Sequence, residues 1–233
     1  MANKELNDII VESQPTDLNT PFKRIYIAYI IFLLAQVCLT ISGASFGANF
    51  KFLPKWLDLL SGFAIVSYAL YLIATTILLK VSKYYYHAFT VALFLIAAMI
   101  LEDICQTSDS GLYKSWGRAM TWTIDFLEAL FFGYFFQGTY LVLKNNKYEK
   151  GKKKLKAYLV AFLVIYILEL LVHIFSLFPF IVNNIVANRV FLYTDWALLF
   201  VFYVYILAIA IISMVYIHRV KKQKEAPIDE KNA

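Results

Sequence analysis

Charged residues are scarce in this chain. Asp, Glu, Lys and Arg make up 16% of its 233 residues, whereas hydrophobic residues make up 61% and the mean hydropathy is +0.64. Because soluble domains carry about 25% charged residues, this composition excludes an ordinary water-soluble domain. The polar residues separate apolar runs of about 20 residues, which is the length that a bilayer core requires. The composition therefore indicates an integral membrane protein.

Cysteine and histidine are also rare, which bears on metal and redox chemistry. The two cysteines, Cys38 and Cys105, lack the spacing of a zinc site or a redox motif. Both fall near the same expected membrane face, so two free thiols are favoured and a disulfide is the alternative. His173 is the one histidine deep in an apolar run, which argues against a tight zinc site. We expect no metal and no cofactor.

Proline and glycine are too few inside the apolar runs to break them. All five prolines lie in the tails or at run ends, and the intramembrane glycines are Gly43, Gly62, Gly133 and Gly138. Transporters often build midplane sites from helices interrupted by Gly or Pro, and that signal is weak here. Bulky side chains also exclude close packing through GxxxG motifs. We therefore expect continuous helices that pack through aromatic side chains.

Six apolar runs are present, and they predict an all-α polytopic integral membrane protein. The runs span residues 25–45, 57–79, 84–102, 118–143, 156–178 and 191–217. We expect six transmembrane helices arranged as three helical hairpins. Residues 1–24 then form a polar N-terminal tail, 25–218 the transmembrane domain, and 219–233 a basic C-terminal tail.

The basic residues predict the orientation of the chain. With six alternating spans, 17 of the 22 Lys and Arg residues fall on the side that holds both termini. The other side keeps Lys51, Lys55, Lys114, Arg118 and Arg189. Since positive charge marks the cytoplasmic side, we expect both termini in the cytoplasm and the protein in the plasma or inner membrane of the cell.

A lysine-rich stretch joins the fourth and fifth runs. Its candidate membrane-surface residues are Lys144, Lys147, Lys150, Lys152, Lys153 and Lys154. The net charge of +6 raises the question of nucleic acid, but the basic residues gather at membrane edges, so we expect no nucleic-acid partner. Lysines at this position attract anionic lipid headgroups at about 1 kcal/mol each, which makes such lipids expected partners.

The even-numbered runs resemble one another. Asp58, Asp125 and Asp195 lie near their outer ends, 67 and 70 residues apart. Each is followed eight to ten residues later by a tyrosine, namely Tyr68, Tyr134 and Tyr203 or Tyr205. A hairpin repeated three times predicts this pattern, and the charge distribution of any such topology is the alternative explanation.

Acids deep inside the runs are the candidate site. Asp125 and Glu128 lie on one face at i, i+3, and His173 follows Glu169 at i+4. A charged side chain facing lipid at that depth costs a few kcal/mol, so these groups are expected to face the bundle interior and to be functional. The further candidates near the mouth or on aromatic faces are Asp195, Glu102, Asp103, Trp122, Trp196, Tyr134 and Tyr203.

Several chemical interpretations of these acids stay open. They form a pocket for a cation or hydrogen-bond donor, with aromatic rings supplying cation–π contacts; they bind or relay protons or an ion; or they act as an acid/base pair. No Ser–His elbow, HExxH or multi-histidine set supports an enzyme. The structural alternative is that the acids only fix helix register through hydrogen bonds.

The function expected from these patterns is non-enzymatic. The layout resembles the membrane-embedded sensor halves of some bacterial receptors in architecture alone, and architecture does not determine function. We expect a membrane sensor or accessory subunit that binds a small ligand from outside and signals through a protein partner or a second copy. The alternative is a small transporter, or the substrate-binding subunit of one, for a cation or a proton-coupled solute.

Overall fold

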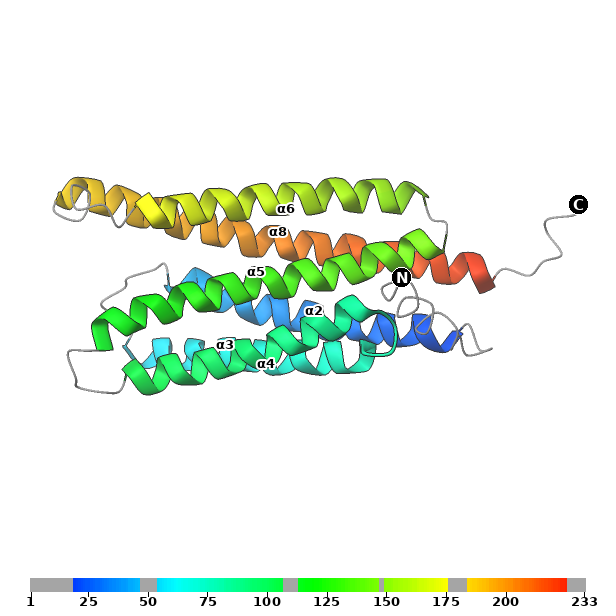
Figure 1. The fold of residues 1–233 in the computed structure, drawn as a ribbon, viewed down its shortest axis with the longest axis horizontal. Helices are drawn as coiled ribbons and strands as arrows, with labels where there is room; N and C mark the ends of the chain where they lie inside the picture. The colour runs from blue at the N-terminus through cyan, green and yellow to red at the C-terminus, as the bar shows by residue number, and fades with distance from the viewer. Residues whose placement is uncertain (1–18, 47–53, 107–112, 147–148, 176–183, 226–233) are drawn as a thin grey trace, which may run out of the picture.

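The computed structural model of the chain (Figure 1) describes residues 19–46, 54–106, 113–146, 149–175 and 184–225. Within these residues the protein is helical and contains no strand. The helices are α2 (Asn19–Phe46), α3 (Pro54–Leu78), α4 (Lys83–Gln106), α5 (Tyr113–Asn145), α6 (Glu149–Phe175) and α8 (Ile185–Glu225). The all-α prediction is confirmed, and each predicted apolar run coincides with one helix. Four helices extend beyond both ends of their runs, because helical backbone hydrogen bonding continues into the polar flanks.

Local signals set several helix ends. The side-chain oxygen of Asn184 accepts hydrogen bonds from the backbone N–H groups of Val186 at 3.0 Å and Ala187 at 3.2 Å. This N-cap satisfies two of the donors that the first turn of α8 leaves unpaired. Between α3 and α4 the chain makes a tight turn, in which the Val81 N–H donates to the Leu78 carbonyl at 2.9 Å.

Five of the described helices are long and apolar enough to cross a membrane. The qualifying segments are Phe22–Ser42, Lys83–Glu102, Thr123–Asn145, Lys150–Val172 and Ile185–Lys222. Helix α3 contributes a shorter apolar segment, Gly62–Leu78, and its side chains are described from Gly62 onward. Several apolar helices of spanning length in one chain support the prediction of a multi-pass membrane protein.

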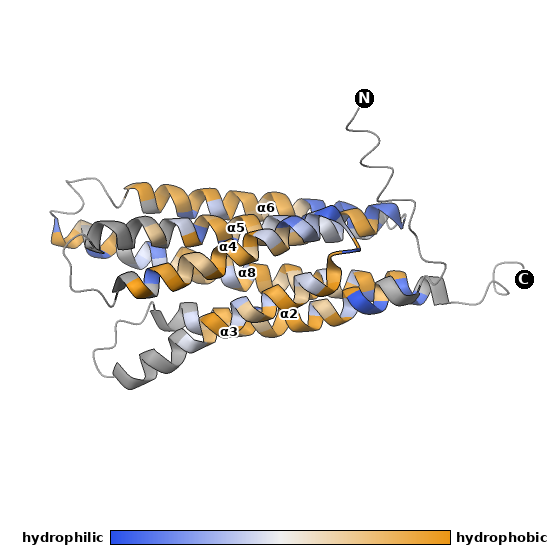
Figure 2. Cartoon of the chain, turned by 60° about the horizontal axis from the view of Figure 1, so that its bottom comes forward, coloured by the Kyte–Doolittle hydropathy of each residue, from blue (hydrophilic) through white to orange (hydrophobic). Residues whose placement is uncertain are grey.

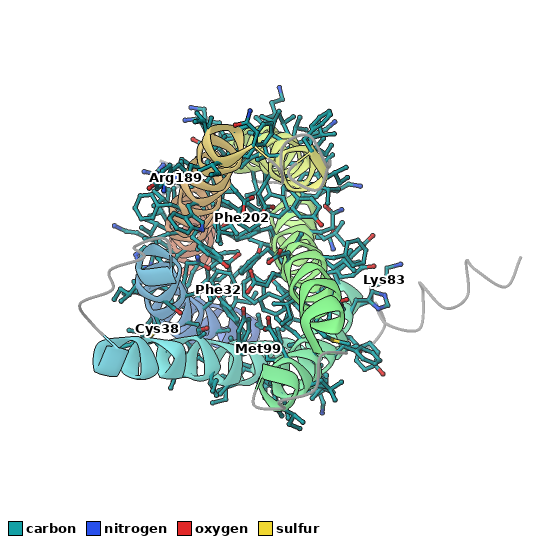
Figure 3. The ribbon with its side chains drawn as sticks, turned by 90° about the vertical axis from the view of Figure 1, so that its left-hand side faces the viewer. Phe32, Cys38, Lys83, Met99, Arg189 and Phe202 are labelled. Carbon is teal, nitrogen blue, oxygen red and sulfur yellow. The ribbon has the colours of Figure 1, made fainter. Side chains whose placement is uncertain are left out.

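The six described helices form a closed ring in chain order. Each helix packs against the next, α8 returns to pack against α2, and α5 also touches α8 across the interior. The pairs α2–α3 and α4–α5 pack most extensively. Figure 3 looks along the bundle, and the side chains of Phe32 and Phe202 point into the ring. This order places residues of α2, α5, α6 and α8 around one shared interior.

The outer surface of the ring is apolar. Phe94 and Ile65, for example, are both 63% exposed, a state that suits lipid contact and would be unfavourable over so large an area in water. The basic residues gather where α2, α4 and α6 begin and where α3, α5 and α8 end (Figures 1 and 2). We call this the basic end, defined by Lys23, Arg24, Lys80, Lys83, Lys144, Lys150, Lys152, Lys153, Lys154, Lys156, Arg219, Lys221 and Lys222.

Candidate ligand-binding site in the bundle interior

Two carboxyl groups are buried among apolar side chains. Glu128 of α5 is 2% exposed and Glu169 of α6 is 5% exposed. The two carboxyl groups lie close enough to interact electrostatically. Asp125 is half-buried about one turn from Glu128. The structure therefore brings two of the predicted acids together from neighbouring helices, in the half of the bundle farther from the basic end.

Two tyrosines complete this group. The Tyr203 hydroxyl of α8 donates a hydrogen bond to Glu128 Oε2 at 2.9 Å. Tyr203 is also within electrostatic range of Asp125, and Tyr166 of α6 is within range of both Asp125 and Glu169. We call these five residues, Asp125, Glu128, Tyr166, Glu169 and Tyr203, the acidic cluster.

The position of Glu169 follows from how α6 packs. Leu155, Phe162 and Glu169 are buried and lie seven residues apart on α6, which is two helical turns and therefore one face. Most other described residues of that helix are half-buried or exposed. Glu169 thus lies on the inward-facing side of α6, at a position where a leucine or phenylalanine would continue the apolar pattern.

A buried amide ties the cluster to the first two helices. Tyr71 of α3 donates to Gln36 Oε1 at 2.7 Å. The Gln36 Nε2 group donates to the backbone carbonyl of Tyr203 at 3.2 Å. Gln36 and Tyr71 are fully buried. A hydrogen-bonded path therefore connects Glu128 through Tyr203 to α2 and α3.

Sequence reasoning missed Gln36, Tyr71 and Tyr166. Signals for two of them were present. Gln36 is an amide inside an otherwise apolar run, where polar side chains commonly bond across helices, and Tyr166 lies at i−3 from Glu169 on the same face. Tyr71 had no such signal, because a tyrosine in an aromatic-rich run is indistinguishable from its neighbours until its partner is known.

The structure does not bring every predicted residue to the cluster. The Tyr134 ring packs against His87 at 5.4 Å and Tyr84 at 6.5 Å between ring centroids, on the α4 side of α5. Trp196 is half-buried and makes an edge contact with Tyr193 at 5.7 Å. The tyrosines of the proposed repeat thus occupy unlike surroundings, since Tyr203 binds Glu128 and Tyr134 does not.

The remaining candidates divide into two groups. Asp195 and Glu102 are half-buried, on α8 and α4, toward the end opposite the basic end. The side chains of Asp103, Trp122 and His173 lie outside the described residues.

The lysines predicted at the membrane surface lie at the basic end. Lys144, Lys150, Lys153 and Lys154 are exposed and Lys152 is half-buried. Lys147 lies outside the described residues.

Cys38 is a free thiol, whereas the side chain of Cys105 lies outside the described residues. The prediction of two free thiols, with a disulfide as the alternative, therefore stays a prediction.

The chemistry available to the acidic cluster is attraction of positive charge and acceptance of hydrogen bonds. Among the described residues, no group of three or more His, Cys, Asp and Glu has the arrangement to hold a metal ion. The buried polar residues of this part of the chain include two acids and no Lys, Arg or His. Comparison of the chain with known protein families, curated proteins and solved structures found no match.

Proposed function

We propose that this protein is a non-enzymatic membrane sensor or accessory subunit that binds a small ligand, cationic or rich in hydrogen-bond donors, at the acidic cluster. It crosses the plasma or inner membrane six times as three hairpins, with both termini and the basic end in the cytoplasm. The observation that carries the proposal is the burial of Glu128 and Glu169 side by side, next to half-buried Asp125.

The energetic cost of the cluster supports a functional role. An acid at the centre of a bilayer costs about 2.5–3.5 kcal/mol on insertion scales, and two neighbouring carboxylates repel each other. A hydrogen bond that only fixed helix register is available from Gln or Asn without either cost. A cationic ligand between the carboxyl groups offsets both, and the rings of Tyr166 and Tyr203 supply faces for cation–π contact.

The proposal is tested by equilibrium binding to the purified protein in lipid nanodiscs. Choline and putrescine are suitable probes, since one is a quaternary ammonium ion and the other a primary diamine. We expect saturable binding of at least one probe, and its loss in Glu128→Gln and in Glu169→Gln. Glu149→Gln makes the same chemical change at the start of α6 and should bind like the parent protein. Equal binding by all four proteins would reject the site.

Transport is the second candidate, because intramembrane acids also serve proton and cation pathways. Proteoliposomes that contain the protein alone distinguish the two. A sensor binds the probe without moving it, whereas a transporter accumulates protons or cations in a way that Glu169→Gln abolishes.

The basic end suggests the partners. Its lysines and arginines lie where anionic lipid headgroups are found on the cytoplasmic leaflet, and we propose that they bind such lipids. We further propose that the sensor signals through a protein partner or a second copy of itself.

A further inference from the structure

A second buried polar group lies closer to the basic end. It consists of Tyr29, Tyr85, Thr139 and Ser213, which come from α2, α4, α5 and α8 and are all 0% exposed. The Thr139 hydroxyl is hydrogen-bonded to Tyr29 and, at 3.0 Å, to Tyr85. Ser213 lies beside the Tyr29 hydroxyl. We call these four residues the hydroxyl layer.

Helix α2 shows what separates the two polar groups. Tyr29 belongs to the hydroxyl layer and Gln36 is hydrogen-bonded at the acidic cluster. They are seven residues apart, or about 10 Å along the axis, and Phe32 lies between them. On α5, Glu128 and Thr139 are about 16 Å apart by the same rise, and the intervening segment is rich in phenylalanine.

Five phenylalanine rings from four helices form a closed chain of contacts across the bundle. The distances between ring centroids are 6.1 Å for Phe32–Phe132, 6.2 Å for Phe132–Phe202 and 5.5 Å for Phe202–Phe162. Phe162–Phe136 at 6.4 Å and Phe136–Phe32 at 5.8 Å complete it. This closed chain of aromatic contacts joins α2, α5, α8 and α6. Figure 3 shows two of its members, Phe32 and Phe202, pointing into the ring.

Two further rings fill this layer. Phe135 stacks on Phe32 at 4.3 Å and makes edge contacts with Tyr29 and Tyr85, both at 5.4 Å, so it rests on the hydroxyl layer. Phe131 packs against Phe32 at 6.3 Å on the side of α3. We call Phe32, Phe131, Phe132, Phe135, Phe136, Phe162 and Phe202 the aromatic layer; each is at most 4% exposed.

Such a layer resists the passage of polar solutes. A cation crossing it would leave its hydration shell without gaining a hydrogen-bond acceptor, which costs several kcal/mol or more. Hydrophobic constrictions close membrane pathways in this way. The acidic cluster and the hydroxyl layer therefore lie on opposite sides of this barrier.

We infer that the aromatic layer is the permeability barrier of the bundle, and that it leaves the acidic cluster open to one side of the membrane only, the side opposite the basic end. The inference rests on the proposed function, because it takes the acidic cluster to be the ligand site. It adds the direction of access, and it makes the protein a one-sided receptor rather than a conduit.

Cysteine labelling tests the direction of access without any ligand. In a protein whose Cys38 and Cys105 are replaced by serine, Asp125→Cys reports on the acidic cluster and Ser213→Cys on the hydroxyl layer. Arg189→Cys and Lys80→Cys mark the two ends, since both positions are exposed. The probe is a membrane-impermeant quaternary-ammonium methanethiosulfonate, applied to sealed vesicles of either orientation.

We expect Asp125→Cys to react only from the side on which Arg189→Cys reacts, and Ser213→Cys not to react from that side. Reaction of Asp125→Cys from the Lys80 side, from both sides or from neither would overturn the inference. So would reaction of Ser213→Cys from the Arg189 side. If instead labelling is as expected but Glu128→Gln binds the cationic probes like the parent, the proposed function fails and the barrier stands.

Removing rings tests the barrier itself. With Phe32→Ala and Phe135→Ala together, Ser213→Cys should become reactive from the Arg189 side, at least about tenfold faster than before, because the hydrophobic constriction is lost. Phe94→Ala, which removes a lipid-facing ring, should leave its reactivity unchanged. Should the double variant not be recovered as a monodisperse protein, the single variants Phe32→Ala and Phe135→Ala each remove one ring of the layer and should show a smaller increase in the same direction. An unchanged rate in the double variant, or in both single variants where only these are recovered, would contradict the assignment.

Discussion

The acidic cluster and the hydroxyl layer are buried to a similar degree but differ in chemistry. In the hydroxyl layer, neutral side chains of four helices meet around Thr139, which is hydrogen-bonded to Tyr29 and Tyr85. In the acidic cluster, Glu128 receives a hydrogen bond from Tyr203 while a second carboxyl group, that of Glu169, lies nearby. The hydroxyl layer adds hydrogen bonds between neutral groups, whereas the acidic cluster places two ionisable groups close together where a charge is expensive.

We propose different roles for the two groups on the basis of this difference. Hydrogen bonds between neutral hydroxyls, such as those that join Thr139 to Tyr29 and Tyr85, fix the packing of neighbouring helices. Neighbouring acids add repulsion to that packing when both are ionised, which is why we propose that they serve a ligand. The aromatic layer keeps the two environments apart.

The largest expected effect on stability comes from Phe32, a central ring of the aromatic layer. Phe32 contacts four phenylalanines and Tyr71, so Phe32→Ala leaves a cavity and should lower the free energy of unfolding by about 3–5 kcal/mol. Phe94→Ala, at a 63% exposed position, should change it by less than about 0.5 kcal/mol. Denaturant titration in mixed micelles measures both, and equal effects would contradict the proposed core.

A smaller effect is expected where α4 approaches α5. A Cβ added at Gly138 would lie 2.9 Å from the buried Tyr85 ring, whereas one added at Gly133 would meet nothing within 4 Å. Gly138→Ala should therefore displace Tyr85 from the hydroxyl layer and cost about 1–3 kcal/mol of stability. Gly133→Ala is the matched control and should be neutral or stabilising, because Ala favours helix. Thermal unfolding that ranks the two variants in the reverse order would refute this packing.

Thr139→Val tests the hydroxyl layer directly. The valine keeps the shape but leaves the hydroxyls of Tyr29 and Tyr85 without this partner, which should cost about 1–2 kcal/mol. Choline and putrescine binding should stay unchanged, since the layer lies beyond the aromatic barrier. Thr90→Val, at the α4 surface, controls for the substitution, and a loss of probe binding in Thr139→Val alone would show that the two polar groups are not independent.

Tyr203→Phe should have the smallest effect on stability and a clear one on binding. It removes the 2.9 Å hydrogen bond to Glu128, and interhelical hydrogen bonds in membranes are worth about 0.6 kcal/mol on average. Because the bond orients the carboxyl group toward the cluster, the probes should bind about three- to tenfold more weakly. Isothermal titration measures the affinity for the probes, and thermal unfolding of the same samples measures the change in stability. A large stability loss with unchanged binding would make Tyr203 a structural residue.

Much of the fold could be predicted because the apolar runs are long. Each run coincides with one helix. The cost of exposing a charge to lipid predicted that Glu128 and Glu169 face the interior, and both are buried. The order of the helices in the ring could not be predicted. Most of the helices are apolar on every face, so their sequences do not indicate which face packs against which neighbour.

The details of the site were harder to predict for the same reason. Tyr134 was grouped with the acids from its spacing along the chain, yet its ring faces α4 because it lies about 240° around α5 from Glu128. Gln36 is part of the site because its amide donates a hydrogen bond to the backbone carbonyl of Tyr203. This contact depends on α2 lying beside α8. Such contacts follow from tertiary packing and not from the periodicity of either helix.

The most direct measurement is the binding affinity and the thermal midpoint of Asp125→Asn and Glu128→Gln, determined on the same preparations. If the acids serve a ligand, both variants should lose choline or putrescine binding while their midpoints stay equal to or above that of the parent protein, because like charge has been removed. Lower midpoints with binding retained would contradict the account and leave the acids a purely structural role.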